Sequence, residues 1–192
     1  MIRSVFAILL PVFHFTLTAF AVDGPKDAVV LLVRHAEKPE SGFALSFRGQ
    51  QRADAYKRYF RKFTVDSKPL LLDAIFASSD SDESHRSRLT VEPLARAVKL
   101  EVDTRFKAKQ TAKLADELRA REQGKRVLVC WHHGDIPDLL NALGADPDRI
   151  LPDGKWPGPV FDWVIQLRFD SKGHLIPAGT KRIAEHLLPG DS

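Results

Sequence analysis

Residues 28–37, AVVLLVRHAE, decide the fold that the sequence predicts. Apolar residues run without a break to Val33, and the charged pair Arg34 and His35 follows directly. A short, Val- and Leu-rich run without polar alternation is typical of a strand buried on both faces of a parallel sheet. In open α/β sheets, ligands bind at the carboxyl edge of such strands. The stretch therefore predicts a buried strand that delivers a histidine to a ligand site.

A second stretch, residues 126–134 (RVLVCWHHG), has the same design, because an apolar run again ends at a histidine, His132. Strand and helix patterns alternate along the chain, which predicts a three-layer α/β sandwich: a mainly parallel sheet with helices on both faces. Right-handed crossovers then place the ends of both histidine-bearing strands at one edge of the sheet. The sequence therefore predicts that His35 and His132 meet there.

The remaining elements follow from spacing and turn residues. Further strands are expected at residues 70–78, at 100–103 and at 161–169; the last is expected as an antiparallel edge strand that forms a hairpin through residues 171–173. Helices are expected after Ser46, around residues 91–98, over 111–121 and from Gly134, while residues 145–159 read as irregular. Five basic residues lie largely off the apolar stripe of the first helix and are expected in solvent: Arg52, Lys57, Arg58, Arg61 and Lys62.

The N-terminal segment has the pattern of a secretory signal peptide. Residues 1–21 carry one cation, Arg3, then an apolar stretch, then a small-x-small site at residues 19–21. The stretch is short and interrupted by Pro11 and His14, which disfavours a stable membrane anchor, although an uncleaved anchor stays an alternative. We therefore expect an exported protein, periplasmic or secreted, with one domain over residues 22–192.

Composition limits the classes of partner. The 192 residues carry a formal net charge of +4, and the basic residues are spread along the chain rather than gathered in blocks. No nucleic-acid motif accompanies them, so no nucleic-acid partner is expected, and the chain is expected to be a monomer or a weak oligomer. The single cysteine, Cys130, lies in an apolar strand and is interpreted as a small buried hydrophobe.

The residue types at the predicted edge favour a phosphoryl ligand. Arg34, Lys38 and Arg86 supply fixed cations, and arginine is the preferred partner of phosphate oxygens. Free N–H groups of a helix starting at Gly134 would add positive charge. Neighbouring cations lower the pKa of a histidine, which would keep His35 neutral and nucleophilic.

Two other interpretations of the histidines stay open. A metal centre could use His35, His132 and His133 with Asp135 or Glu37. The adjacent arginine opposes a cation there, and neither H-x-x-x-H nor H-E-x-x-H spacing is present. Solvated, purely structural histidines at strand ends are the other alternative.

Four stretches together resemble the histidine phosphatase superfamily, which has the phosphoglycerate-mutase-like fold. Residues 32–38 (LVRHAEK) resemble its R-H-G/A signature, and residues 45–53 (LSFRGQQRA) resemble its L-[ST]-x-x-G-x-x-[RQ]-A helix start. Residues 86–95 (RSRLTVEPLA) and 127–143 resemble its R-x-x-x-T and second-histidine segments. The four stand in the family's order and cover roughly residues 29–143.

The resemblance implies a metal-independent phosphomonoesterase that needs no cofactor and acts on a small phosphorylated substrate. His35 would be the phosphorylated nucleophile, and Arg34, Arg86 and His132 would hold the phosphoryl group. Lys38 and His133 are further candidates for substrate binding. A catalytically silent phospho-ligand binder is the main alternative, and a mutase is disfavoured because the chain is short.

The chain also departs from the family pattern. Trp131 replaces the Gly or Ser that usually precedes the second histidine. The stretch before Arg86 is longer than usual, so Arg88 is a second candidate for the phosphate-holding arginine. The usual window for a general acid, residues 111–114, contains no carboxylate; Asp135 and Glu83 are the candidates for that role, while Asp116 and Glu117 are assigned to a surface helix.

Overall fold

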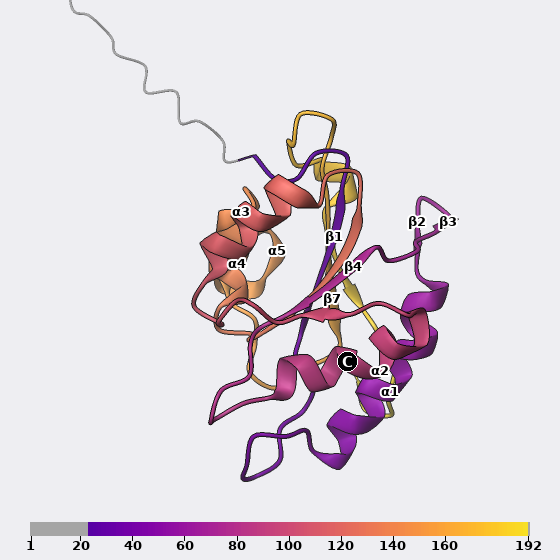
Figure 1. Ribbon diagram of the computed structural model, residues 1–192, viewed down its shortest axis with the longest axis vertical. Helices are drawn as coiled ribbons and strands as arrows, with labels where there is room; N and C mark the ends of the chain where they lie inside the picture. The colour runs from indigo at the N-terminus through magenta and orange to yellow at the C-terminus, as the bar shows by residue number, and fades with distance from the viewer. Residues whose placement is uncertain (1–22, 192) are drawn as a thin grey trace, which may run out of the picture.

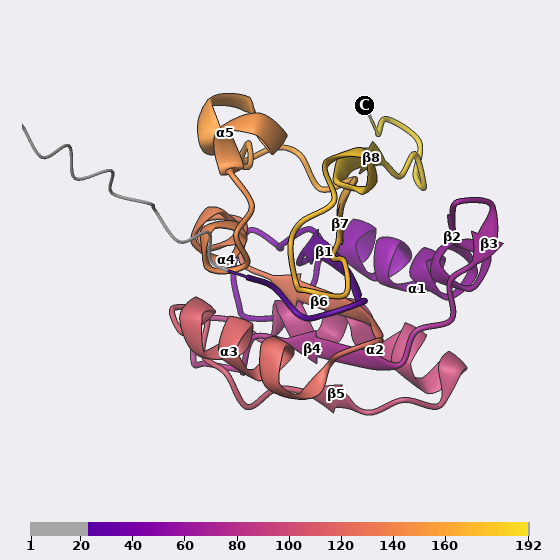
Figure 2. The same cartoon turned by 90° about the horizontal axis from the view of Figure 1, so that it is seen from above.

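A computed structural model describes residues 23–191, so the predicted signal peptide lies outside the described residues. The core of the fold is a sheet of six strands, whose bounds are β1 (Val29–Arg34), β4 (Ala74–Ala77), β5 (Val102–Asp103), β6 (Arg126–Trp131), β7 (Trp163–Arg168) and β8 (Lys181–Ala184). Figure 1 shows the fold, and the strand order β5-β4-β6-β1-β7-β8 can be followed from above in Figure 2. The strands β5, β4, β6 and β1 pair in parallel, whereas β7 pairs antiparallel with both β1 and β8.

The central strands are buried on both faces because two separate apolar clusters cover the sheet. In β1, Val30 and Leu32 belong to one cluster, while Leu31 and Val33 belong to the other. The same alternation in β6 places Cys130 in the second cluster, where burial raises the pKa of its thiol. This arrangement explains why the two histidine-bearing strands read as continuous apolar runs.

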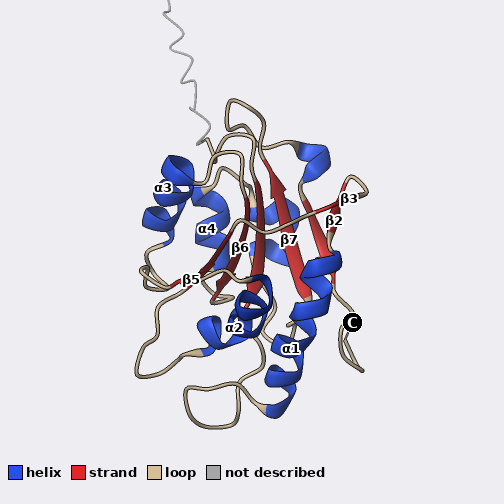
Figure 3. Ribbon diagram, turned by 45° about the vertical axis from the view of Figure 1, so that its right-hand side comes forward, coloured by secondary structure: helices blue, strands red, loops and turns tan. Residues whose placement is uncertain are grey.

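Helices cover both faces of the sheet, as Figure 3 shows. Their bounds are α1 (Phe47–Lys62), α2 (Arg86–Val98), α3 (Thr111–Arg121), α4 (Ile136–Ala142) and α5 (Pro147–Ile150). The α1 and α2 helices pack on one face, and α3 and α4 pack on the other. The predicted three-layer α/β sandwich with an antiparallel edge hairpin is therefore confirmed. Among residues 23–191, no helix is long and apolar enough to cross a bilayer.

Several expected elements differ in their bounds. The strand expected at residues 161–169 is not the edge strand, because β8 pairs with its outer side. The helix expected from Gly134 begins two residues later, at Ile136, with Asp135 at its N-cap. Residues 145–159 contain α5 and a short 3-10 helix (Pro152–Gly154) rather than only irregular chain. A small hairpin of β2 (Thr64–Val65) and β3 (Lys68–Pro69) was not predicted.

Arg52 contradicts the expectation that it lies in solvent, since only 1 % of its side chain is exposed. Its guanidinium donates to the carboxylates of Glu37 and Asp191, each at 2.7 Å, and lies 3.6 Å from Glu185. Burial raises the pKa of Glu185 to about 8, which favours its neutral form at pH 7. Arg48 also pairs with Glu37 and Asp191. The ion pairs therefore join the segment after β1, the α1 helix and the chain after β8.

We expect Arg52→Met to destabilise the protein by about 3–5 kcal/mol, because two carboxylates would lose their buried cationic partner. Urea unfolding of both proteins at pH 7 measures the difference. The matched control is Arg61→Met on the exposed side of the same helix, with an expected change within about 0.5 kcal/mol. Equal stability of the two variants would contradict the burial of this network.

Candidate active site

The pairing of β1 with β6 brings the two predicted histidines together. Arg34 lies opposite Trp131 in the parallel register, and the His35 amide continues the ladder by donating to the Trp131 carbonyl at 3.0 Å. His35 and His132 therefore leave neighbouring strands at the same level. Their ring centroids lie 5.2 Å apart and the rings meet edge to face at 72°. The predicted meeting of His35 and His132 at the carboxyl edge is confirmed.

The contact of His35 with its own neighbour fixes the imidazole tautomer. Nδ1 of His35 lies 2.8 Å from the Ala36 carbonyl oxygen, which can only accept a hydrogen bond. Nδ1 therefore carries the proton, and Nε2 of the neutral ring keeps its lone pair. A histidine held in this way is oriented as a nucleophile.

The surroundings of His35 keep its ring neutral. Burial lowers the pKa of His35 to about 3, the Ala36 carbonyl opposes this shift, and the nearby charges of His132, Arg34 and Arg86 add to it. Burial is also the main cause that lowers the pKa of His132 and that of His133. The site therefore holds neutral imidazoles beside permanent guanidinium charges near neutral pH.

A pocket of about 490 Å³ contains most of the residues predicted for the site. Its lining comprises Arg34, His35, Lys38, Arg86, Lys109, His132, His133, Gly134, Asp135 and Gly158. The Nε atoms of Arg34 and Arg86 are buried, and neither has an acceptor among the described residues. Buried guanidinium N–H groups without a partner are costly. Together with the other cations of the lining, these two guanidinium groups favour an oxyanion as the ligand of this pocket.

Arg34 also holds one wall of the pocket. Its Nη1 donates to the carbonyl oxygens of Gly158 at 2.6 Å and Val160 at 2.8 Å, and more weakly to that of Pro157 at 3.3 Å. The guanidinium carbon lies 3.7 Å from the centroid of the Phe161 ring, a cation–π contact. Burial lowers the pKa of Arg34 to about 10, so that the group stays charged at pH 7. The sequence pattern did not reveal this wall.

The segment that follows β1 packs closely against the start of α1, where a polar cap and a glycine are needed. Ser46 caps the helix by accepting from the Gly49 amide at 3.1 Å, and its own amide donates to the Glu37 carbonyl at 2.9 Å. A Cβ atom on Gly49 would lie 2.4 Å from that carbonyl oxygen, so only glycine fits. The motif at residues 45–53 therefore packs α1 against the segment that follows His35.

Thr90 connects α2 to the same segment. Its Oγ1 accepts from the Ala36 amide at 2.8 Å and donates to the Arg86 carbonyl at 2.7 Å. Arg86 begins α2, and its Nη1 lies 3.3 Å from the Gly42 carbonyl. The spacing of four residues between Arg86 and Thr90 thus places the guanidinium in the pocket beside His35.

Lys109 is a charged lining residue that sequence reasoning missed. Its ammonium group pairs with Asp135 at 2.6 Å, at the N-cap of α4. Trp131, the departure from the family pattern, lies in the apolar cluster on the side of α3 and α4 and donates from Nε1 to the Ala108 carbonyl at 2.8 Å. The tryptophan therefore fastens the loop that carries Lys109, and its unusual presence was the one available sign of that loop.

Two predicted residues lie outside the pocket. Arg88 donates to Asp80 through Nε and Nη2 at 2.9 and 2.8 Å, and its Nη1 lies 3.4 Å from Glu92. Glu83 is exposed in the preceding loop and does not line the pocket. The structure thus selects Arg86 over Arg88 and Asp135 over Glu83 as neighbours of His35.

Comparison with solved structures finds the same arrangement of elements in proteins of low sequence identity. Phosphoserine phosphatase from Entamoeba histolytica matches with a TM-score of 0.56 and 15% identity, over 84% of this chain and 100% of that one. Alpha-ribazole phosphatase from Shigella flexneri matches with a TM-score of 0.55 and 13% identity, over 85% of this chain and 99% of that one. Phosphoglycerate mutase from Plasmodium falciparum matches with a TM-score of 0.53 and 16% identity, over 86% of this chain and 96% of that one. No protein-family model and no curated protein matches the sequence.

This chain has the fold of the histidine phosphatase superfamily. The resemblance seen in the sequence is therefore confirmed at the level of the fold. Within this histidine phosphatase fold, the four quoted motifs supply the paired strands, the capped α1 and the α2 start that surround one pocket. Among residues 23–191, no three His, Cys, Asp or Glu side chains are grouped to hold a metal ion.

The depressed pKa of His35 predicts a specific dependence of stability on pH. Between about pH 3 and 6.5 the unfolded chain binds a proton at this residue and the folded chain does not, so the free energy of unfolding falls as pH falls. His35→Gln removes this effect. The stability of the variant relative to the original protein should rise on going from pH 7 to pH 5, by up to about 1.4 kcal/mol per pH unit below 6.5. Urea unfolding at pH 5, 6 and 7 measures it, and a constant difference would contradict the neutral, buried state of His35.

Proposed function

We propose that this protein is a phosphatase that hydrolyses phosphate monoesters through a phosphohistidine on His35. The supporting observation is the convergence of a neutral imidazole of fixed tautomer with the side chains of Arg34 and Arg86 in one pocket. Arginine donors suit the three equivalent oxygens of a phosphoryl group. The neighbouring folds, two of them phosphatases by name, are consistent with this chemistry.

In the first step, Nε2 of His35 attacks phosphorus and the bond from phosphorus to the ester oxygen breaks. The proton stays on Nδ1, and its hydrogen bond to the Ala36 carbonyl holds the ring while positive charge spreads onto the imidazole. Arg34, Arg86 and His132 hold the phosphoryl oxygens, with Lys38 and His133 at the edge of the pocket. Fixed cations of this kind stabilise the charge on the transferring group, and one such donor is typically worth about 3–4 kcal/mol.

In the second step, water attacks the phosphohistidine, the bond from phosphorus to Nε2 breaks, and inorganic phosphate leaves. Asp135 is the proposed acid for the leaving oxygen and the base for this water, because among residues 23–191 it is the one carboxylate that lines the pocket. The chain's own cations supply the positive charge of the site, so we propose that hydrolysis needs neither a metal nor a cofactor.

The proposed location and assembly rest on the sequence alone. We propose that residues 1–21 direct export to a periplasm or the outside of the cell, where the protein would act as a monomer or weak oligomer on a small phosphorylated substrate. Transfer to a second phosphorylated substrate, as in a mutase, is the less favoured alternative.

We expect the protein to release phosphate from p-nitrophenyl phosphate in the presence of EDTA. His35→Ala should lower kcat by more than about 10⁴-fold, because the attacking nitrogen is lost. The matched control is His174→Ala, since His174 lies at the surface near Asp23 and Asp170, and its activity should be unchanged. Rapid quench with a ³²P-labelled substrate should trap an adduct that is labile in acid and stable in base.

Three outcomes of these assays would contradict the proposal. Loss of activity in EDTA would indicate a metal centre. An acid-stable adduct would exclude a histidine nucleophile. Phosphate binding without turnover or adduct would show that the protein is a phospho-ligand binder.

The role of Asp135 predicts a dependence on the leaving group. Asp135→Asn should lower kcat/KM for an alkyl phosphate by about 100-fold or more, because the alkoxide needs a proton, and should affect p-nitrophenyl phosphate far less. Asp138→Asn is the control, as Asp138 is exposed in the first turn of α4 and does not line the pocket. Equal losses on both substrates would instead assign Asp135 to holding Lys109.

A further inference from the structure

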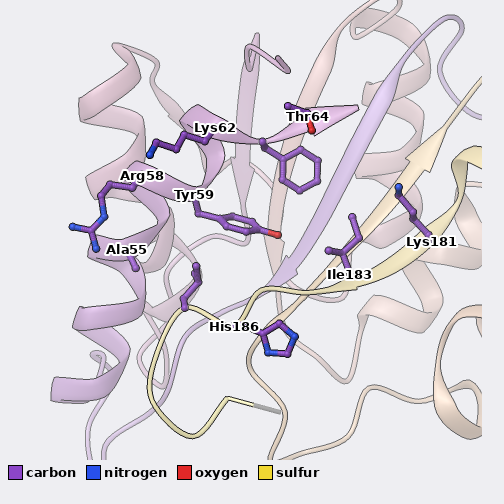
Figure 4. Close-up of a pocket in the computed structure, with 10 residues that line it drawn as sticks. Ala55, Arg58, Tyr59, Lys62, Thr64, Lys181, Ile183 and His186 are labelled. Carbon is purple, nitrogen blue, oxygen red and sulfur yellow. The ribbon is translucent and has the colours of Figure 1, made fainter. Parts of the chain in front are cut away.

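A second concave site lies between α1 and β8 and shares no lining residue with the pocket of His35. We propose that this groove, of about 580 Å³, binds an organic anion that has a flat apolar body and two or more negative charges. Arg58 and Lys62 lie along α1, whereas Lys181 and His186 lie on and after β8, as Figure 4 shows. This inference does not depend on the proposed phosphatase activity.

Within residues 23–191, the cations of the groove have no acidic partner, whereas Arg88 pairs with Asp80 and Arg105 pairs with Asp103. Among the described residues, none of the four basic side chains of the groove has an ion pair or a side-chain hydrogen bond, and no Asp or Glu lines the groove. Cations gathered without acids raise the local concentration of anions.

The floor of the groove is apolar and aromatic. Phe63 is buried, and Tyr59 and Ile183 are half-buried. The Tyr59 hydroxyl has no hydrogen-bond partner among the described residues, and Figure 4 shows it directed across the groove toward Ile183. Burial and the nearby Glu185 raise the pKa of Tyr59, so its hydroxyl stays protonated and available as a donor. Apolar walls with a few polar groups are typical of small-molecule sites, and the volume lies in their usual range of about 300–1,000 Å³.

The shape of the surface favours an inserted ligand over a lipid membrane. Membrane-binding surfaces bury protruding apolar side chains in the lipid. The most exposed large apolar residues of the described chain are Phe43, Phe47 and Leu71, and none of them lines the groove. The apolar part of this site is recessed below its basic rim, where a flat ligand body can enter.

His186 gives the groove an independent structural mark. Its φ is +48°, in the left-handed region that residues other than glycine rarely adopt. Such conformations cost free energy and are enriched at functional sites. A glycine would adopt this backbone without strain, yet the sequence places an imidazole there, at the mouth of the basic groove.

The test uses naphthalene-1,5-disulfonate and backbone amide NMR, which reads the groove (residues 55–64 and 181–187) separately from the His35 pocket. Lys62→Glu and Lys181→Glu should each weaken binding at the groove amides by at least about fivefold, because attraction becomes repulsion. The control Lys172→Glu changes the net charge equally at an exposed lysine that does not line the groove, and should leave the affinity unchanged. Turnover of p-nitrophenyl phosphate should be the same in all three variants.

His186→Gly separates binding from folding. Relief of the left-handed strain should keep or raise the melting temperature, while loss of the imidazole should weaken binding at the groove amides. A purely structural His186 would leave the affinity unchanged.

Two results would overturn the proposal. The first is disulfonate binding that shifts only the amides around His35, or groove affinities that neither glutamate variant changes. In the second, the protein binds phosphatidylglycerol vesicles, Lys181→Glu abolishes that binding, and the disulfonate shifts no groove amide. This result would assign the surface to a membrane.

Discussion

The in-register parallel pairing of β1 with β6 is the constraint on which the site depends. Arg34 lies opposite Trp131, so the next residue of each strand is a histidine, and the two rings lie 5.2 Å apart. Side chains alternate between faces along a strand, and a slip of one residue would exchange the faces of a whole strand. Because both faces of β1 and β6 are buried in apolar clusters, the packing of the core fixes the spacing of the imidazoles.

The residues around Arg52 balance the charges that lie next to the apolar clusters of the sheet. Two guanidinium groups, Arg48 and Arg52, meet the carboxylates of Glu37 and Asp191. Glu185 has a pKa raised to about 8 and is therefore mostly neutral at pH 7. With the half-exposed Arg48 at its edge, the cluster thus approaches neutrality as a group, which limits the desolvation cost of its buried members. Glu37 lies two residues after His35, so this balanced cluster also holds the chain that carries the nucleophile.

The sequence predicted the layers, the two histidine-bearing strands and most of the pocket, because apolar runs and helical stripes are local patterns. It failed where contacts between distant residues decide the outcome. Arg52 lies off the apolar stripe of α1 yet is buried, since its partners come from the ends of β1 and β8. Trp131 holds the loop of Lys109 at the pocket, and Arg34 holds the wall at residues 157–161. No periodicity in the sequence reveals either contact. Arg88 was the alternative because the stretch before Arg86 is longer than usual, but nearby carboxylates bind it.

Arg34 donates hydrogen bonds to the 157–161 segment and also lines the pocket of His35. A ligand that binds this guanidinium either competes with those carbonyls for its N–H groups or binds while those hydrogen bonds stay in place. The order of the segment and the affinity for an oxyanion are therefore thermodynamically linked through a single side chain. Sequence changes at residues 157–161 can consequently alter ligand affinity during evolution without touching the histidines.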